Sequence, residues 1–219
     1  MTSRTLDWLD ERTGWRAVYA ATLDRMVPKV NWLYTLGSAT LFLALTQAVT
    51  GILLTLYYVP TPQDAYSSIQ YIMNGLSFGW LIRGIHYWGA TLMVVCIYLH
   101  LFRVFFTAAY KYPREVTWVT GVILFLTVQG MGFTGYLLPW DQRAYWATEV
   151  GTAIAGTVPF IGGFILQVLR AGPDLSYLTL TRFFGVHIWV LPAILFSVIG
   201  VHLYLIIRNG ISTVPKPGE

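Results

Sequence analysis

Charged residues and cysteine are scarce in this chain of 219 residues. Asp, Glu, Lys and Arg make up 11% of it, whereas hydrophobic residues make up 56%, and the mean hydropathy is +0.58. This composition excludes an ordinary soluble domain. The one cysteine, Cys96, excludes a disulfide framework and a CxxCH site for covalent haem attachment. The first 30 residues contain no unbroken apolar core, so we expect no cleavable signal peptide, and nothing in the sequence suggests a nucleic acid partner.

Apolar stretches, by contrast, are long. Four of them, 32–58, 80–106, 116–138 and 183–207, are long enough to cross roughly 30 Å of hydrocarbon. We therefore expect an all-α fold: an integral membrane four-helix domain over 32–208, after a surface segment 1–31 and before a tail 209–219. The surface segment is predicted to form an amphipathic helix on the inner face, or a docking segment. The Gly- and Pro-rich connection 141–182 is predicted to hold two short helices at the outer interface.

Basic residues are distributed unevenly between the two sides of the predicted bundle. The side with both termini carries Arg4, Arg12, Arg16, Arg25, Lys29, Arg103, Lys111, Arg114, Arg208 and Lys216, and the other carries Arg83, Arg143, Arg170 and Arg182. The positive-inside rule then places both termini in the cytoplasm or stroma. The second and fourth spans run in the same direction across the membrane.

All four histidines lie in these two spans. His86 and His100 are 14 residues apart and His187 and His202 are 15 apart. These steps equal roughly 3.9 and 4.2 helical turns, or about 21–22 Å along the axis, so each pair returns to one face. The pattern predicts two bis-histidine haem sites, His86 with His187 on the outer side and His100 with His202 on the inner side. The alternative, ordinary core histidines, is disfavoured because ionisable residues are rare inside the membrane.

Glycines repeat the same step in the other two spans. Gly37 and Gly51, and likewise Gly121 and Gly135, are 14 residues apart. A glycine inside a helix is expected where something approaches the backbone closely, and a porphyrin edge is such a group. Close helix packing explains a glycine taken alone equally well. The shared spacing favours four helices enclosing two haems, with Gln47 of the first span as a further candidate for cofactor contact.

Arginines lie near the histidines at the helix ends. A guanidinium at such a position can bind a haem propionate in a bidentate manner, and ordinary snorkelling to the interface is the alternative. The candidates are Arg83, Arg103, Arg114, Arg182 and Arg208.

Several motifs resemble the short cytochrome b subunit of cytochrome b6f complexes, across nearly the whole chain. The fourth span has 14 residues between its histidines where the second has 13, which also resembles the b6f type. The matching stretches are NWLYTLG at 31–37, YIM at 71–73, FGWLIR at 78–83, PREVTWVTG at 113–121, FTGYLLPWDQ at 133–142, LTRF at 180–183 and NGIS at 209–212.

The resemblance implies a subunit of a quinol oxidoreductase with two non-covalent b haems. It implies electron transfer from an outer quinol site, through both haems, to an inner quinone site, and formation of a proton gradient. The implied partners are a subunit IV-like protein, a Rieske iron–sulfur protein and a c-type cytochrome or copper protein, in a dimeric complex. Candidates for the wall of the quinol site are Tyr136, Pro139, Trp140 and Asp141. Alternatives are a dihaem anchor of a hydrogenase- or formate-dehydrogenase-type complex and a haem-free channel or transporter.

The sequence departs from this family at a few positions. Thr35 stands where many members carry a cysteine that binds a third haem covalently, so we expect that haem to be absent. Tyr87 replaces an arginine of plant-type members, and Arg208 comes one place later than the plant pattern, after Ile207. No PEWY motif occurs, which implies that a separate subunit completes the quinol site. A bacterial cytoplasmic membrane is favoured over a thylakoid membrane.

Overall fold

Four long apolar helices dominate the structure, a computed structural model that describes residues 3–22, 24 and 31–212. Within this part of the chain the regular structure is entirely helical. The segments long and apolar enough to cross a membrane are Trp32–Thr55 (η1, Trp32–Thr35, and α3, Leu36–Thr55), Gly79–Phe106 (α5), Glu115–Leu137 (α6) and Tyr177–Asn209. The predicted all-α architecture with four spans is confirmed.

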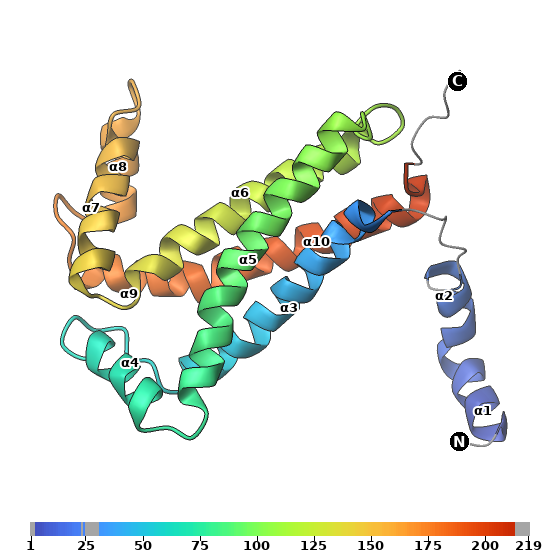
Figure 1. Ribbon diagram of the computed structural model, residues 1–219, viewed down its shortest axis with the longest axis horizontal. Helices are drawn as coiled ribbons and strands as arrows, with labels where there is room; N and C mark the ends of the chain where they lie inside the picture. Colours follow the sequence, from blue (N-terminus) through green and yellow to red (C-terminus); the bar gives the residue numbers. More distant parts are fainter. Residues whose placement is uncertain (1–2, 23, 25–30, 213–219) are drawn as a thin grey trace.

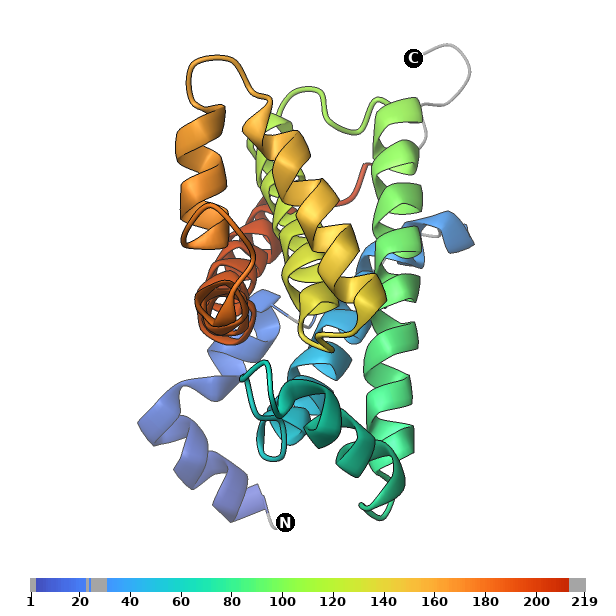
Figure 2. The ribbon, with the colours of Figure 1, turned by 90° about the vertical axis from the view of Figure 1, so that its left-hand side faces the viewer.

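The four spans are arranged as two close pairs. α3 packs along α5, and α6 packs along the last span, while α5 and α6 touch less extensively (Figures 1 and 2). All four helices meet in one buried apolar cluster, made of Leu43, Ala44, Met93, Ile97, Val128 and Leu195. This cluster is the core of the bundle and holds the two pairs together at mid-height.

The last span is one continuous helix of three parts, α9 (Tyr177–Gly185), η2 (Val186–Val190) and α10 (Leu191–Asn209). It begins six residues earlier than the sequence predicted, because Ser176 and Thr179 form a capping box at its start. Among the added residues, Thr179 and Leu180 are fully buried, and Phe183, which follows them, is nearly so. η2 is a π-helical turn, and it lies around His187.

Shorter helices fill the connections at one end of the bundle (Figure 1). α7 (Gln142–Gly156) and α8 (Gly162–Arg170) lie between the third and fourth spans, as predicted for that connection. α4 (Ala65–Asn74) lies between the first two spans and was not predicted. Its apolar side chains Ile69 and Ile72 are buried and it packs against α5, so tertiary contacts stabilise this short helix.

One buried arginine ties the outer helices together. Arg170, at the end of α8, is 5% exposed and its guanidinium lies 2.7 Å from the Glu149 carboxylate. It also donates to Thr152 Oγ1 at 2.8 Å and to the carbonyl oxygens of Glu149 and Pro173. The Thr179 hydroxyl in turn donates to the Arg170 carbonyl. α7, α8 and the start of α9 are therefore linked through the side chain and the carbonyl of a single residue, Arg170.

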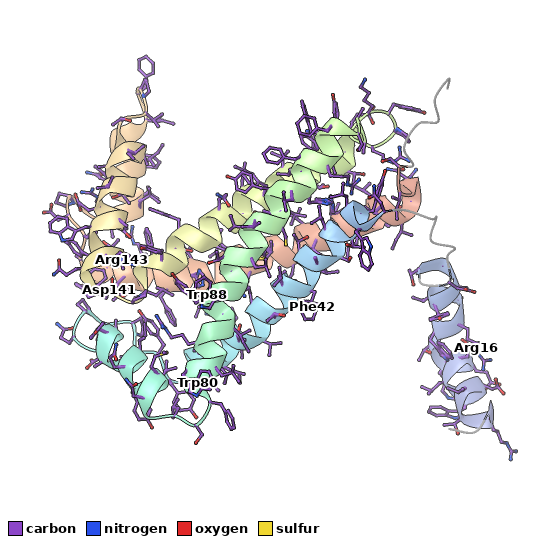
Figure 3. All side chains as sticks on the ribbon, viewed as in Figure 1. Arg16, Phe42, Trp80, Trp88, Asp141 and Arg143 are labelled. Carbon is purple, nitrogen blue, oxygen red and sulfur yellow. The ribbon has the colours of Figure 1, made fainter. Side chains whose placement is uncertain are left out.

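The N-terminal segment forms two helices, α1 (Ser3–Thr13) and α2 (Trp15–Thr22). Arg16 of α2 joins them through ion pairs with Asp7 at 2.7 Å and Asp10 at 3.8 Å (Figure 3). A helix in this segment was predicted, and its place on the inner membrane surface stays a prediction. Arg25, Lys29 and Lys216, which contribute to the predicted orientation, and tail residues 213–219 lie outside the described residues.

The Arg170 contacts generate a prediction about local stability. Replacing Arg170 by Met leaves the Glu149 carboxylate and the Pro173 carbonyl without their donor. Since hydrogen bonds to charged groups contribute about 1.5–3 kcal/mol, losing about 2 kcal/mol makes local opening roughly 30-fold more frequent. Hydrogen exchange of the α8 amides in the purified protein measures this. Arg143→Met, at an exposed position near the start of α7, is the control, and equal α8 exchange in both variants would contradict the assigned role.

Candidate cofactor site

The four histidines lie at two levels of the bundle. His86 on α5 and His187 in η2 face each other, with ring centroids 6.5 Å apart and ring planes at 74°. A metal bound by one nitrogen of each imidazole, at about 2 Å per bond, puts the ring centroids roughly 6 Å apart. The separation of His86 and His187 would therefore suit two imidazoles that bind one metal. His100 and His202 lie further along the same two spans.

Each histidine ring lies against a glycine of the neighbouring helix. A methyl group added to any of these glycines would contact the ring at its Cε1 atom. The separations would be 3.3 Å for Gly51 and His86, 2.6 Å for Gly135 and His187, 3.1 Å for Gly37 and His100, and 3.4 Å for Gly121 and His202. All four spaced glycines thus lie against the four spaced histidines. The group they accommodate directly is the imidazole, and contact with a porphyrin edge stays a prediction.

Threonines next to three of these glycines bind the histidines, and the sequence analysis missed them. The Oγ1 to Nδ1 distances are 2.9 Å for Thr50 and His86, 2.9 Å for Thr120 and His202, and 3.1 Å for Thr134 and His187. The repeated Thr-Gly dipeptide, at 50–51, 120–121 and 134–135, is the signal that identifies them.

These contacts determine which ring nitrogen carries the proton. Each hydroxyl already donates to a carbonyl of its own helix: Thr50 to Thr46 at 2.7 Å, Thr120 to Thr117 at 2.9 Å and Thr134 to Gly130 at 2.8 Å. The threonine oxygen is then an acceptor for the imidazole Nδ1–H. The neutral ring is then protonated at Nδ1 and has a free lone pair at Nε2. This is the tautomer that binds a metal through Nε2.

The π-helical turn explains the unequal histidine spacing. In a regular α-helix, a step of 15 residues would place His202 about 60° around the axis from His187. η2 absorbs one residue by its wider turn. Both histidines of the last span therefore face α6, and each meets its glycine there.

A layer of apolar side chains separates the two histidine levels. Ala44, Met93 and Val128 lie midway between the paired glycines or histidines of their helices, and Leu195 lies within one residue of that midpoint. All four are at most 8% exposed. The bundle therefore provides two separate sites divided by its core.

Buried polar atoms without a partner among the described residues gather at the end of the bundle where α3 begins and α10 ends. Arg103 stacks on the Tyr34 ring at 4.5 Å, yet its Nε atom is unpaired. The atoms in this group are Tyr34 Oη, Arg103 Nε, Thr117 Oγ1 and Ser212 Oγ. Gln47 Nε2 is a similar atom nearer the other level, packed against Gly89. Since buried polar groups normally have partners, this set suits a bound group with polar or anionic atoms. Tyr34, Thr117 and Ser212 were not identified from sequence.

The candidate arginines differ in their surroundings. Arg83 and Arg103 are half-buried one turn from a histidine, and Arg83 donates to the weak acceptor Met73 Sδ at 3.5 Å. Arg114 donates to the carbonyls of Asn209 and Gly210 at 3.3 Å, where it caps α10. The exposed Arg182 donates to the Val168 carbonyl. The exposed Arg208 lines an open groove of 690 Å³ with Ala21 and Thr22 of α2. Arg83 and Arg103 are the best placed to bind an anion at a histidine level.

Of the candidate residues for the quinol site, Tyr136 lies in the last turn of α6, and Pro139, Trp140 and Asp141 lie in the connection between α6 and α7. Tyr58, which follows α3, donates its hydroxyl to the Leu138 carbonyl at 2.7 Å. Burial raises the pKa of Tyr58, so its hydroxyl remains a neutral donor. Trp140 has a positive φ of 49° and packs edge-on against Tyr145.

Polar contacts also fix the start of α7. The Asp141 carboxylate accepts from the Ala144 amide at 2.8 Å and so caps α7, and Tyr136 is 43% exposed. Asp141 and Arg143 lie at the end of the bundle that also carries Trp80, at the start of α5 (Figure 3). The connection between α6 and α7 is thus held in place by the Tyr58 and Asp141 hydrogen bonds.

The sequence is similar to those of known membrane cytochromes. The family model described as "Cytochrome b/b6/petB" matches residues 22–210. The menaquinol:cytochrome c reductase cytochrome b subunit of Bacillus subtilis is 42% identical over 97% of this chain and 99% of its own length. Cytochrome b6 of Chlamydomonas reinhardtii is 44% identical over 96% of this chain and 98% of its own length.

A solved structure described as a hyperthermophilic respiratory Complex III is also similar. It superposes with a TM-score of 0.87 at 33% identity and covers 98% of this chain. The chain spans 58% of the length of that solved chain. With the family match and two relatives of nearly equal length, the chain belongs to the cytochrome b/b6 family.

Proposed function

We propose that this integral membrane protein is the dihaem cytochrome b subunit of a quinol:acceptor oxidoreductase. The observation that carries the proposal is the set of four histidine–glycine contacts at two levels of one bundle. The relative from Bacillus subtilis is named as a subunit of a menaquinol:cytochrome c reductase, which is the same reaction class. The two alternatives, a hydrogenase-type anchor and a haem-free channel, fit neither the family nor this set of contacts.

The chain's own residues prepare each level for one non-covalent b haem. When bound, the haem supplies one-electron chemistry, and two imidazole ligands leave no open position for oxygen or substrate. Thr50, Thr120 and Thr134 hold three of the imidazoles in the ligating tautomer. The glycines allow the rings to lie close to the neighbouring helix. Arg83 and Arg103 are positioned to bind propionates.

A third, covalently bound haem is not part of the proposal. Thr35 stands where a thioether would form, and its hydroxyl donates to the Trp32 carbonyl at 2.6 Å.

The remaining proposed contacts with the two b haems are made by Gly37, Gly51, Gly121, Gly135, Gln47, Arg114, Arg182 and Arg208.

The proposed orientation puts both termini on the cytoplasmic or stromal side. The end of the bundle with the start of α3, the α5–α6 connection and the end of α10 (Figure 1) has Arg103, Lys111, Arg114 and Arg208 near it. This basic end is the inner side by the positive-inside rule. Segment 1–31 is the surface segment, 32–208 the membrane domain and 209–219 the tail, in a bacterial cytoplasmic membrane.

Quinol oxidation is proposed at the outer end, beside the His86–His187 level. One wall of the proposed quinol site is formed by Tyr136, Pro139, Trp140 and Asp141. The apolar α7–α8 segment provides a hydrophobic path for the quinone tail. The chain acts within a complex, inactive alone, with a subunit IV-like protein, a Rieske protein and a c-type cytochrome. We propose that this complex is dimeric.

Counting haems tests the proposal most directly. We expect two low-spin b haems per chain by pyridine haemochrome, and no haem-stained band at the mass of this subunit on a denaturing gel. His86→Ala and His187→Ala should each remove the same component of the redox difference spectrum and leave the other. Loss of different components in these two variants would contradict the proposed pairing, and a stained band would contradict non-covalent binding.

Gly135 provides a packing test of the same site. An alanine methyl there would stand 2.6 Å from Cε1 of His187, and such overpacking typically costs about 1–3 kcal/mol. The haem content of the His86–His187 level should therefore be lower in Gly135→Ala, and this haem should be absent in Gly135→Leu. Gly132→Ala is the control, because it lies on the same helix and its added methyl group would meet none of the described neighbouring atoms within 4 Å. Equal haem content in the Gly135 and Gly132 variants would refute the close contact.

Tyr136 tests the outer quinol site. Tyr136→Trp should lower quinol:acceptor turnover of the intact complex by about tenfold, because the larger ring occupies space that the quinol needs. This loss corresponds to ~1.4 kcal/mol of transition-state stabilisation. Both haems should remain. Val119→Trp, at an exposed position at the opposite end of α6, should keep its turnover. Unchanged turnover in Tyr136→Trp would place the site elsewhere.

A further inference from the structure

The four histidines share a facing glycine but differ in what lies at Nδ1. Three histidines have a threonine hydroxyl at Nδ1, and in each case the threonine directly precedes the glycine that faces the ring. The residue before the fourth glycine, Gly37, is Leu36, which is half-buried. His100 Nδ1 is buried and has no hydrogen-bond partner among the described residues. The His86–His187 level therefore has two such hydrogen bonds and the His100–His202 level has one.

This difference matters for a metal bound at Nε2. When Nδ1–H donates to an acceptor, the imidazole becomes a more basic ligand. A more basic ligand stabilises the more positively charged ferric iron over ferrous iron, so second-shell hydrogen bonding is one means by which a protein sets a haem potential. An imidazole whose Nδ1–H lacks an acceptor does the opposite and favours the reduced state.

We infer that Leu36 is a positioning residue that raises the reduction potential of the His100–His202 haem by denying His100 a hydrogen-bond acceptor. The inference rests on the proposed dihaem function. It makes the electron step from the His86–His187 level to the His100–His202 level downhill, because the level with two hydrogen bonds holds its electron less tightly. The asymmetry comes from one position of the first span and not from the ligands themselves, which are all histidines.

The neighbouring polar groups do not take over the missing role. Tyr34 Oη and Thr117 Oγ1 lie at the same end of the bundle, but neither makes a hydrogen bond with any described residue. Neither of them therefore accepts a hydrogen bond from His100 Nδ1. Arg103, one turn after His100, stacks on the Tyr34 ring and provides only donors. Leu36 therefore occupies the one place where, by comparison with the other three sites, an acceptor would stand.

The test adds the missing hydroxyl. In the intact complex, Leu36→Thr should lower the midpoint potential of the His100–His202 component, by up to tenfold in the reduction equilibrium constant, or 59 mV for one electron. The other component should not shift. Leu36→Val, which has nearly the shape of threonine but no hydroxyl, is the matched control and should leave both potentials unchanged. The components are assigned from the spectra of the histidine variants.

The opposite change at the other level completes the test. Thr134→Val should raise the potential of the His86–His187 component, and Thr134→Ser, which keeps the hydroxyl, should restore it. Equal potentials in Leu36→Thr and Leu36→Val, with haem bound, would overturn the inference. If Leu36→Thr fails to assemble, equal potentials in Thr134→Val and Thr134→Ser would overturn it instead. Fewer than two haem components in the unmodified complex would refute the dihaem proposal itself.

Discussion

The close approach of an imidazole ring to a glycine of the neighbouring helix is the contact on which this structure depends. It occurs four times, between α3 and α5 and between α6 and the last span, with the ring Cε1 within 3.4 Å of where a methyl group would stand. A larger residue at any of these positions would push the helices of a pair apart. The two close pairs, the separation of the two levels and the Thr–Nδ1 hydrogen bonds all require this approach.

Much of this arrangement could be predicted from sequence because it is periodic. Equal steps of 14 residues placed His86 and His100, and the glycine pairs, at matching heights, and the apolar runs gave four spans. Features that depend on non-periodic contacts could not be predicted in this way. The partners of Tyr58 and Arg170 lie 80 and up to 21 residues away, and α4 forms because it packs against α5. Thr120 and Thr134 were visible as Thr-Gly dipeptides, yet their hydroxyls resemble ordinary polar residues of an apolar helix.

The connection between α6 and α9 combines a rigid frame with an exposed apolar surface. Arg170, Glu149 and Thr179 fix α7 and α8 to the start of α9, and Tyr58 fixes the turn at Leu138. On this frame Trp146, Ile154 and Phe164 are largely exposed. A wall that is preformed in this way lowers the entropy cost of binding a partner or substrate beside it.

The π-helical turn at 186–190 also affects how this chain is compared with others. His187 and His202 are 15 positions apart in this chain. A protein whose two histidines are 14 positions apart in its last span has one residue fewer there, but its histidines can reach the same two heights. The gap in an alignment between them therefore belongs inside the turn, next to His187. If the gap is moved to a flanking loop, each intervening residue is displaced by about 100° around the helix, and core-facing positions such as Leu195 are equated with lipid-facing ones.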